Sequence, residues 1–241
     1  MAKKNSKREY ELITHERPKA LVSEAYRTLR TNLGFTEIDQ KYRSILLSSP
    51  NPMDGKSMTI ANLAVVLAQA GHKVILVDCD LRKPMQHEIF KLPNQRGVTN
   101  CLMQNLEIAE VAQATAVENL NLLSSGPIPP NPAEILNSES TRALWGRLQE
   151  EYDYILVDGP PVLAVADASI LAGQVDGVIL VLWSGHSRID AARQAKEQLS
   201  RAGANLIGVV LNQVEVKRNN YYYNYGSYYY YGYGEGSARK K

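Results

Sequence analysis

Short apolar runs of about strand length recur along the chain, separated by segments with helical spacing. The runs read "SILLSS", "KVILVDCD", "YDYILVDG", "GVILVLW" and "NLIGVVLN", and helical patterns such as "SMTIANLAVVLAQAG" and "RIDAARQAKEQLSRAG" lie between them. Strands that are apolar on both faces are typical of parallel sheets that helices cover on both sides. The sequence therefore predicts an α/β fold of three layers around a central, mostly parallel sheet. Such sheets bind ligands at the carboxyl ends of their strands.

The loop after the first apolar run reads "SSPNPMDGKSM" and leads into a helical pattern. A Gly-Lys-Ser between a buried strand and a helix is typical of a phosphate-binding loop, in which backbone N–H groups and the helix N-terminus face the anion. Lys56 would neutralise the β- and γ-phosphates, and the Ser57 hydroxyl could ligate Mg²⁺. The predicted nucleotide-binding residues of this loop are Pro52, Met53, Asp54, Gly55, Lys56, Ser57 and Met58. The strict consensus is not met, because Pro50 stands at its first glycine position.

Carboxylates follow two of the other runs. Asp78 and Asp80 close the second run, and Asp158 closes a later one. A single aspartate after a strand is usually a turn former or a helix cap. Three of them beside one Gly-Lys-Ser loop are instead typical of a Mg²⁺-nucleotide site, since Mg²⁺ prefers one or two carboxylates together with phosphate and water oxygens.

Charge, cysteine content and terminal sequence limit the classes of protein to consider. A net charge of +2 is too mild for a nucleic-acid binder, so we expect no nucleic acid as a partner. Cys79 and Cys101 form neither a CxxC pair nor a disulfide framework, which predicts reduced thiols in a cytoplasmic protein. The polar N-terminus is not a signal peptide, and no run approaches the roughly 20 apolar residues of a membrane-spanning helix.

The polar residues 1–19 predict a flexible arm in front of a single domain, residues 20–216. That domain opens with a helix over about 21–35, for which Ser23 is a candidate cap, and its apolar residues recur at helical spacing. Three charged residues of this helix recur every third position and therefore share one side: Glu24, Arg27 and Arg30.

The C-terminal segment has a different composition. Beyond residue 216, Tyr, Gly, Asn and Ser replace aliphatic residues, so residues 217–241 have no apolar stripe to bury. This composition predicts a disordered tail. Nine of the 14 tyrosines of the chain lie there: Tyr221, Tyr222, Tyr223, Tyr225, Tyr228, Tyr229, Tyr230, Tyr231 and Tyr233. Aromatic-polar repeats of this kind can also be mere low-complexity sequence with a tendency to aggregate.

The combination of "GKS", "ILVDCDLRKP" and "ILVDGPP" with the "EAYRTLRTNL" helix and the tyrosine tail resembles the bacterial tyrosine kinases of capsule and exopolysaccharide synthesis. These are P-loop ATPases with a Walker A, a second Walker A-like and a Walker B motif, and the resemblance covers nearly the whole chain. It implies protein-tyrosine kinase activity with ATP and Mg²⁺ as cofactors. Lys56, Asp78 and Asp80 would then be catalytic, with Asp78 as the base that accepts the tyrosine proton. Ser57, Asp80 and Asp158 would hold the metal and its water shell.

Two further residues have roles in this resemblance, and one departs from it. Arg82 could touch a phosphate or pair with a carboxylate, and Asn212 could meet the adenine. Family members usually read Pro-Gly-Glu-Gly-Lys-Ser-Thr where this chain has Met53 in place of the first glycine. A methionine side chain there could crowd the phosphates and slow turnover.

The resemblance also implies an assembly. Glu24, Arg27 and Arg30 match an intersubunit motif that closes a homo-oligomeric ring, an octamer in the family, in which the tail tyrosines of one subunit are phosphorylated by the next. The expected partners are a membrane-embedded activator that recruits the cytoplasmic chain to the inner face of the cell membrane, a cognate phosphotyrosine phosphatase and other protein substrates. Two alternatives remain: a nucleotide-switched partitioning or positioning ATPase of the same superfamily, and a catalytically weak scaffold.

Overall fold

The computed structural model describes residues 10–36, 42–104 and 106–215. Its centre is a seven-stranded sheet in the order β3-β4-β2-β5-β1-β6-β7, and all neighbouring strands are parallel except β3 and β4. The strands are β1 (Ser44–Ser48), β2 (Val74–Asp78), β3 (Gln113–Ala114), β4 (Leu120–Leu123), β5 (Tyr154–Asp158), β6 (Gly177–Trp183) and β7 (Leu206–Asn212). The prediction of an α/β fold with a mostly parallel sheet is confirmed.

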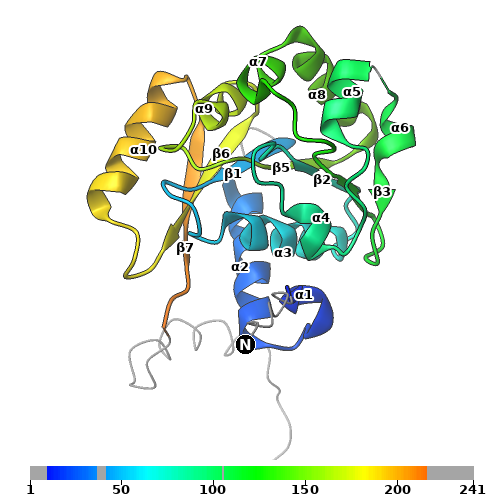
Figure 1. Ribbon diagram of the computed structural model, residues 1–241. Coiled ribbons are helices and arrows are strands. Elements are labelled where there is room, and N and C mark those ends of the chain that lie inside the picture. Colours follow the sequence, from blue (N-terminus) through cyan, green and yellow to red (C-terminus); the bar gives the residue numbers. More distant parts are fainter. Residues whose placement is uncertain (1–9, 37–41, 105, 216–241) are drawn as a thin grey trace, which may run out of the picture.

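Helices cover both faces of the sheet (Figure 1). They are α1 (Ile13–Glu16), α2 (Leu21–Thr36), α3 (Lys56–Ala68), α4 (Gln86–Ile89), α5 (Val98–Gln104), α6 (Ile108–Val111), α7 (Pro132–Leu136), α8 (Glu139–Glu151), α9 (Asp167–Ala172) and α10 (Ile189–Arg201). Residues of α2 and α3, with Leu12 just before α1, join one buried apolar cluster, whereas residues of α8, α9 and α10 join a second cluster on the opposite face. The three predicted layers are therefore present.

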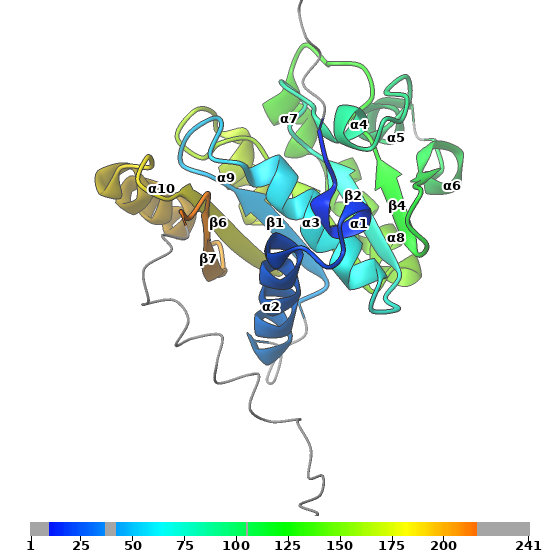
Figure 2. The same ribbon diagram turned by 90° about the horizontal axis from the view of Figure 1, so that it is seen from below.

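Helix α3 is the most buried helix of the domain, because eleven of its thirteen residues are buried. It follows the predicted phosphate loop directly, and it lies between the sheet and α1 with α2 (Figure 2). The strand β1, which leads into the loop, is buried along its whole length at the middle of the sheet. The loop between β1 and α3 is thus held between two deeply buried elements.

The flexible arm that the sequence predicts over residues 1–19 is contradicted over residues 10–14, which pack on the domain, whereas residues 15–19 are exposed. The buried Thr14 of α1 donates its hydroxyl to the side-chain oxygen of Asn62 in α3 at 2.8 Å. Ser23 does not cap α2 but lies inside it, where its hydroxyl donates to the carbonyl oxygens of Ile13 and Arg17. These contacts join residues far apart in sequence, so polarity alone does not reveal them. Residues 1–9 and the tyrosine-rich tail over 217–241 lie outside the described residues.

Candidate active site

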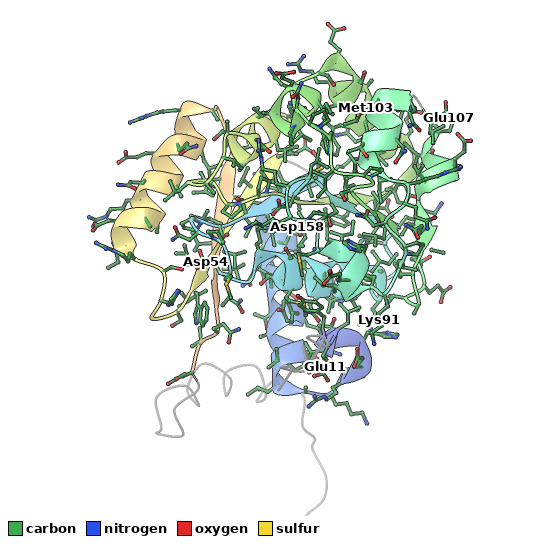
Figure 3. The ribbon with its side chains drawn as sticks, in the orientation of Figure 1. Glu11, Asp54, Lys91, Met103, Glu107 and Asp158 are labelled. Atoms are coloured by element: carbon green, nitrogen blue, oxygen red, sulfur yellow. The ribbon has the colours of Figure 1, made fainter. Side chains whose placement is uncertain are left out.

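The three carboxylates meet at one edge of the sheet because their strands are parallel and adjacent. Asp78 ends β2 and Asp158 ends β5, and the two residues are direct partners in the register of these strands. Lys56 begins α3 beside them, and Asp158 lies near the middle of the molecule in Figure 3, with Asp54 of the phosphate loop on one side. The central strand order β2-β5-β1 thus brings both aspartate runs to the loop that follows β1.

Lys56 is the cation of this cluster. Its Nζ atom lies 3.1 Å from Asp80 Oδ2, 3.2 Å from Asp158 Oδ1 and 3.1 Å from Ser57 Oγ. Burial by itself would lower the pKa of the ammonium group, but the carboxylates of Asp158 and Asp80 outweigh it and raise the pKa. Lys56 therefore stays charged, as a group that neutralises phosphate oxygens must.

Asp78 is fully buried and is held by the backbone rather than by a cation. Its Oδ2 accepts hydrogen bonds from the N–H groups of Met85 and Gln86, each at 2.9 Å, whereas its Oδ1 has one long contact, 3.3 Å from the N–H of Asp80. Burial, and next the charge of Asp158, raise the pKa of Asp78 to about 8. Only the ionised form of Asp78 can act as a general base, and a pKa of about 8 makes that form a minor fraction at neutral pH that grows as the pH rises. In that form Oδ1 is the oxygen with the weaker existing contact.

The phosphate loop adopts left-handed backbone geometry at two positions. Gly55 has φ of 93°, a conformation that strains any residue with a side chain, and a Cβ atom there would also displace the Asn212 side chain, which would lie 2.0 Å away. Met53 has φ of 71°, in a region where a side chain is strained, and 68% of its surface is exposed. The loop thus keeps the conformation that glycine favours at this position of the family motif, at the expense of local strain.

Asp54 and Asn212 brace the loop. Asp54 is buried and accepts hydrogen bonds from the Ser187 hydroxyl at 2.9 Å and from the N–H of Asn51 at 3.1 Å. Asn212, at the end of β7, donates from Nδ2 to the carbonyl oxygen of Asp54 at 3.1 Å. The predicted contact of Asn212 with adenine stays a prediction, whereas its contact with the loop is established.

Of the two roles considered for Arg82, the structure has the ion pair. Its Nε and Nη2 atoms donate to the two carboxylate oxygens of Asp167 at 2.8 and 3.1 Å. Asp167 is fully buried at the start of α9, while 42% of the Arg82 side chain is exposed. The bidentate pair fixes the guanidinium plane beside the "DLRKP" segment.

The sequence did not single out Asp167, Ser187 or Gln86 as site residues. Gln86, the first residue of α4, donates to Asp158 Oδ2 at 2.7 Å and to the carbonyl oxygen of Ser57 at 3.1 Å. Nothing in "KPMQHEIF" distinguishes it from a surface glutamine, because its role depends on two elements distant in sequence. Asp167 had one weak signal, since an aspartate before a short apolar pattern is also a common helix start.

The three charged residues of α2 have contacts within the chain. Arg27 forms an ion pair with Glu24 and also donates to the carbonyl oxygen of Pro18 at 2.7 Å. Arg30 donates to the carbonyl oxygen of Val66, near the end of α3, at 2.9 Å. An intersubunit role for these residues stays a prediction. Arg30 already links α2 to α3 within the chain, so it would have both roles.

The donor set fits a metal that arrives with phosphate. Among the described residues, no three His, Cys, Asp or Glu side chains are arranged to hold a metal ion by themselves. Mg²⁺ in nucleotide sites uses one or two carboxylates with phosphate and water oxygens, and Ser57, Asp80 and Asp158 converge on Lys56 in a way that suits this. Cys79 and Cys101 are both free and buried, and neither forms a disulfide. No helix in the described ranges has both the length and the apolar content that crossing a bilayer requires.

Comparisons with known proteins agree with this geometry. Residues 53–200 match a family described as an AAA domain. The chain is 42% identical to the tyrosine-protein kinase YwqD of Bacillus subtilis (strain 168), over 93% of this chain and 94% of the relative. The crystal structure of the chimerical protein CapA2B2 superposes with a TM-score of 0.81 at 41% identity, covering 84% of this chain and 89% of that one. The kinase domain of the Escherichia coli tyrosine kinase ETK gives 0.83 at 28% identity, covering 98% and 89%.

These findings decide between the hypotheses that the sequence left open. The relatives are named tyrosine-protein kinases and match along almost the entire chain, which favours the kinase over a partitioning or positioning ATPase. The matched domain implies nucleotide binding, and the buried lysine with its neighbouring carboxylates lies in the phosphate-loop region of that domain. The chain therefore belongs to the bacterial tyrosine-protein kinases.

Proposed function

We propose that the protein transfers the γ-phosphoryl group of ATP to tyrosines, first of all to the cluster in its own C-terminal tail. The observation that carries this proposal is the position of Asp78, a buried carboxylate of raised proton affinity next to the Lys56 cluster. A phenol has a pKa near 10, so a base beside it is useful at neutral pH. A partitioning ATPase needs no such base for a phenol.

The chemistry follows from the positions of the groups. The phenol oxygen forms a bond to the γ-phosphorus, the bond from this phosphorus to the bridging oxygen breaks, and its electron pair passes to the β-phosphate of the departing ADP. The phenol proton moves to Asp78, and Oδ1 is the oxygen with the weaker existing contact. Lys56 neutralises the phosphate oxygens. Ser57, Asp80 and Asp158 would hold Mg²⁺, which supplies charge neutralisation on the phosphates when bound.

The tail and the ring belong to the same proposal. In a ring closed through Glu24, Arg27 and Arg30, the tail of one subunit would present tyrosines 221–233 to the active site of the next. Each phosphate adds nearly two negative charges, so phosphorylated tails would repel one another and leave the carboxylate-lined site. Autophosphorylation would then favour opening of the ring.

A place at the membrane and a role in polysaccharide synthesis complete the proposal. By its relationship to the family, the cytoplasmic chain would be recruited to the inner face of the membrane by a membrane-embedded activator, and a phosphotyrosine phosphatase would reverse its modification. The chimerical nature of CapA2B2 is consistent with a partner of that kind in one relative. Capsular or exopolysaccharide synthesis and export would be the regulated process, through this chain and its other protein substrates.

The test is incubation of the purified chain with Mg²⁺ and ATP, followed by mapping of phosphotyrosine. We expect the signal in the tail, no signal without Mg²⁺, and none in Lys56→Met. Thermal unfolding of Lys56→Met must accompany the assay, since removal of the lysine leaves buried carboxylates without their cation. ATP hydrolysis without phosphotyrosine would contradict the proposal, and absence of both would favour the scaffold.

A further inference from the structure

Gln86 joins three parts of the site through one residue. Its backbone N–H donates to Asp78 Oδ2 at 2.9 Å, and its side-chain Nε2 donates to Asp158 Oδ2 at 2.7 Å and to the carbonyl oxygen of Ser57 at 3.1 Å. The residue is fully buried. A single side chain therefore ties the end of β5 to the start of α3, while its backbone holds the base.

The orientation of the Gln86 amide follows from its partners. A carboxylate and a peptide carbonyl are both acceptors, so the nitrogen must face them and the oxygen must point elsewhere. That oxygen, Oε1, is buried and has no hydrogen-bond partner among the described residues. Buried carbonyl oxygens are nearly always hydrogen-bonded, so an orphaned acceptor between groups that serve a metal and a phosphate points to a donor that arrives with the ligand.

A second amide in the chain shows what a purely structural glutamine looks like. Gln174 donates from Nε2 to the carbonyl oxygen of Leu136 at 2.9 Å, and its Oε1 accepts from the indole nitrogen of Trp145 at 3.2 Å. Both ends of that amide are satisfied within the fold. Gln86 also donates through Nε2, to a carboxylate and a carbonyl, but its acceptor oxygen has no partner in the part of the chain that the structure describes.

We propose that Gln86 is a positioning residue for the metal-nucleotide, with Nε2 fixing Asp158 against the start of α3 and Oε1 accepting a hydrogen bond from a water of the Mg²⁺ shell. This rests on the proposed nucleotide site but adds a residue that the family motifs do not include. Outer-shell partners of metal ligands typically contribute 10–100-fold in metal affinity. The contribution of Gln86 should therefore depend on the metal and not on the nucleotide alone.

The experiment measures binding of a fluorescent N-methylanthraniloyl-ADP to the full chain by anisotropy, with Mg²⁺ and with EDTA. The variants are Gln86→Leu and the near-isosteric Gln86→Met, with Gln174→Met as the matched structural control. With Mg²⁺, we expect both Gln86 variants to bind the nucleotide about tenfold or more weaker than the parent chain. With EDTA, the Kd of each variant should stay within about twofold of the parent value. A Mg²⁺ titration at fixed nucleotide should shift to higher concentration by the same factor.

Any one of four results would overturn the proposal. Equal losses of nucleotide affinity with Mg²⁺ and with EDTA would show that Gln86 contacts the nucleotide itself or only supports the packing of the loop. A Mg²⁺ dependence equal to that of the parent would make the amide merely structural, as would failure of both variants to fold. A Gln174→Met chain that lost the Mg²⁺ effect would show that the readout reports general destabilisation. Because the probe is ADP binding, a negative result would leave the phosphotyrosine test of kinase activity unaffected.

Discussion

Replacement of Asp78 by asparagine should stabilise the fold while it strongly slows phosphoryl transfer. The side chain is fully buried beside Asp158, and its pKa rises from 3.8 to about 8. Between these two values the unfolded chain is ionised at this position, whereas the folded chain holds the proton. Folding therefore requires uptake of a proton, and the stability of the parent chain falls as the pH rises from about 4 to about 8. Asparagine does not titrate and escapes this loss.

The magnitude follows from the shift. The interval from the ordinary pKa of 3.8 to pH 7 is about three pH units, and each unit costs the folded parent chain about 1.4 kcal/mol of stability. The largest stabilisation that Asp78→Asn can give at neutral pH is therefore about 4 kcal/mol. An asparagine oxygen can still accept hydrogen bonds from the N–H groups of Met85 and Gln86. The asparagine NH₂ group, however, replaces Oδ1 and so faces another donor, the N–H of Asp80, which reduces the gain. We therefore expect about half the limit, about 2 kcal/mol, or a rise in Tm of about 4–8 °C for a domain of this size.

Thermal unfolding of the parent and of Asp78→Asn in EDTA, at pH 5.5 and pH 8, measures this difference. The gap in Tm should widen toward pH 8, and Asp190→Asn, whose side chain is 71% exposed, should show no gap at either pH. Tail phosphorylation by Asp78→Asn should fall by about 10²–10⁴-fold, the range of general base catalysis. A gap that is constant or narrows as the pH rises would refute the assignment of a raised pKa to Asp78.

Three other substitutions test separate parts of the structure. Met53→Gly should raise the free energy of unfolding, measured by urea denaturation, by about 0.5–1 kcal/mol. The relief of about 1–2 kcal/mol of left-handed backbone strain exceeds the entropic cost of glycine. Met53→Ala keeps the strain and should show no such gain. Thr14→Val should lower stability by about 1 kcal/mol by removing the hydroxyl donated to Asn62, while Thr14→Ser should not, and equal losses would refute the role of this hydrogen bond. Arg27→Ala should reduce the molar mass in light scattering to that of a monomer, with Arg30 kept for its contact with α3; a persistent large oligomer would count against the ring.

Much of the sheet was predictable from the sequence, and the exceptions have physical reasons. Five strands coincide with long aliphatic runs. Four of them are parallel strands inside the sheet, which must be apolar on both faces, whereas β7 is an edge strand that is apolar but only partly buried. The strand β4 was missed because it has only four residues, "LNLL", interrupted by a half-buried asparagine. The strand β3 has two residues and depends on pairing with β4. Short edge elements of this kind are defined by their neighbours rather than by local pattern.

The chemistry of the site was predictable in its residue types but not in its pairings. Lys56, Ser57 and the three carboxylates come together because each follows a strand of one parallel sheet. The spacing of the carboxylates in the sequence does not predict which of them contacts Lys56. Asp80 and Asp158 contact the ammonium group of Lys56, whereas Asp78 is held by backbone N–H groups. That difference depends on the turn over residues 80–86, whose geometry no sequence rule specifies.

Two locally unfavourable features of the domain lie at the candidate active site. Met53 holds a left-handed φ without glycine, and Asp78 buries a carboxyl group without a cation in direct contact. Both depart from the rules that make a sequence locally consistent with its fold, and such departures are expected where function requires them. Neither can relax easily, because the loop is braced through Asp54 and Asn212, and α3 behind it is almost entirely buried. The burial of α3 therefore does more than stabilise the domain, since it also maintains a strained loop and a proton-binding carboxylate in the positions that the proposed phosphoryl transfer needs.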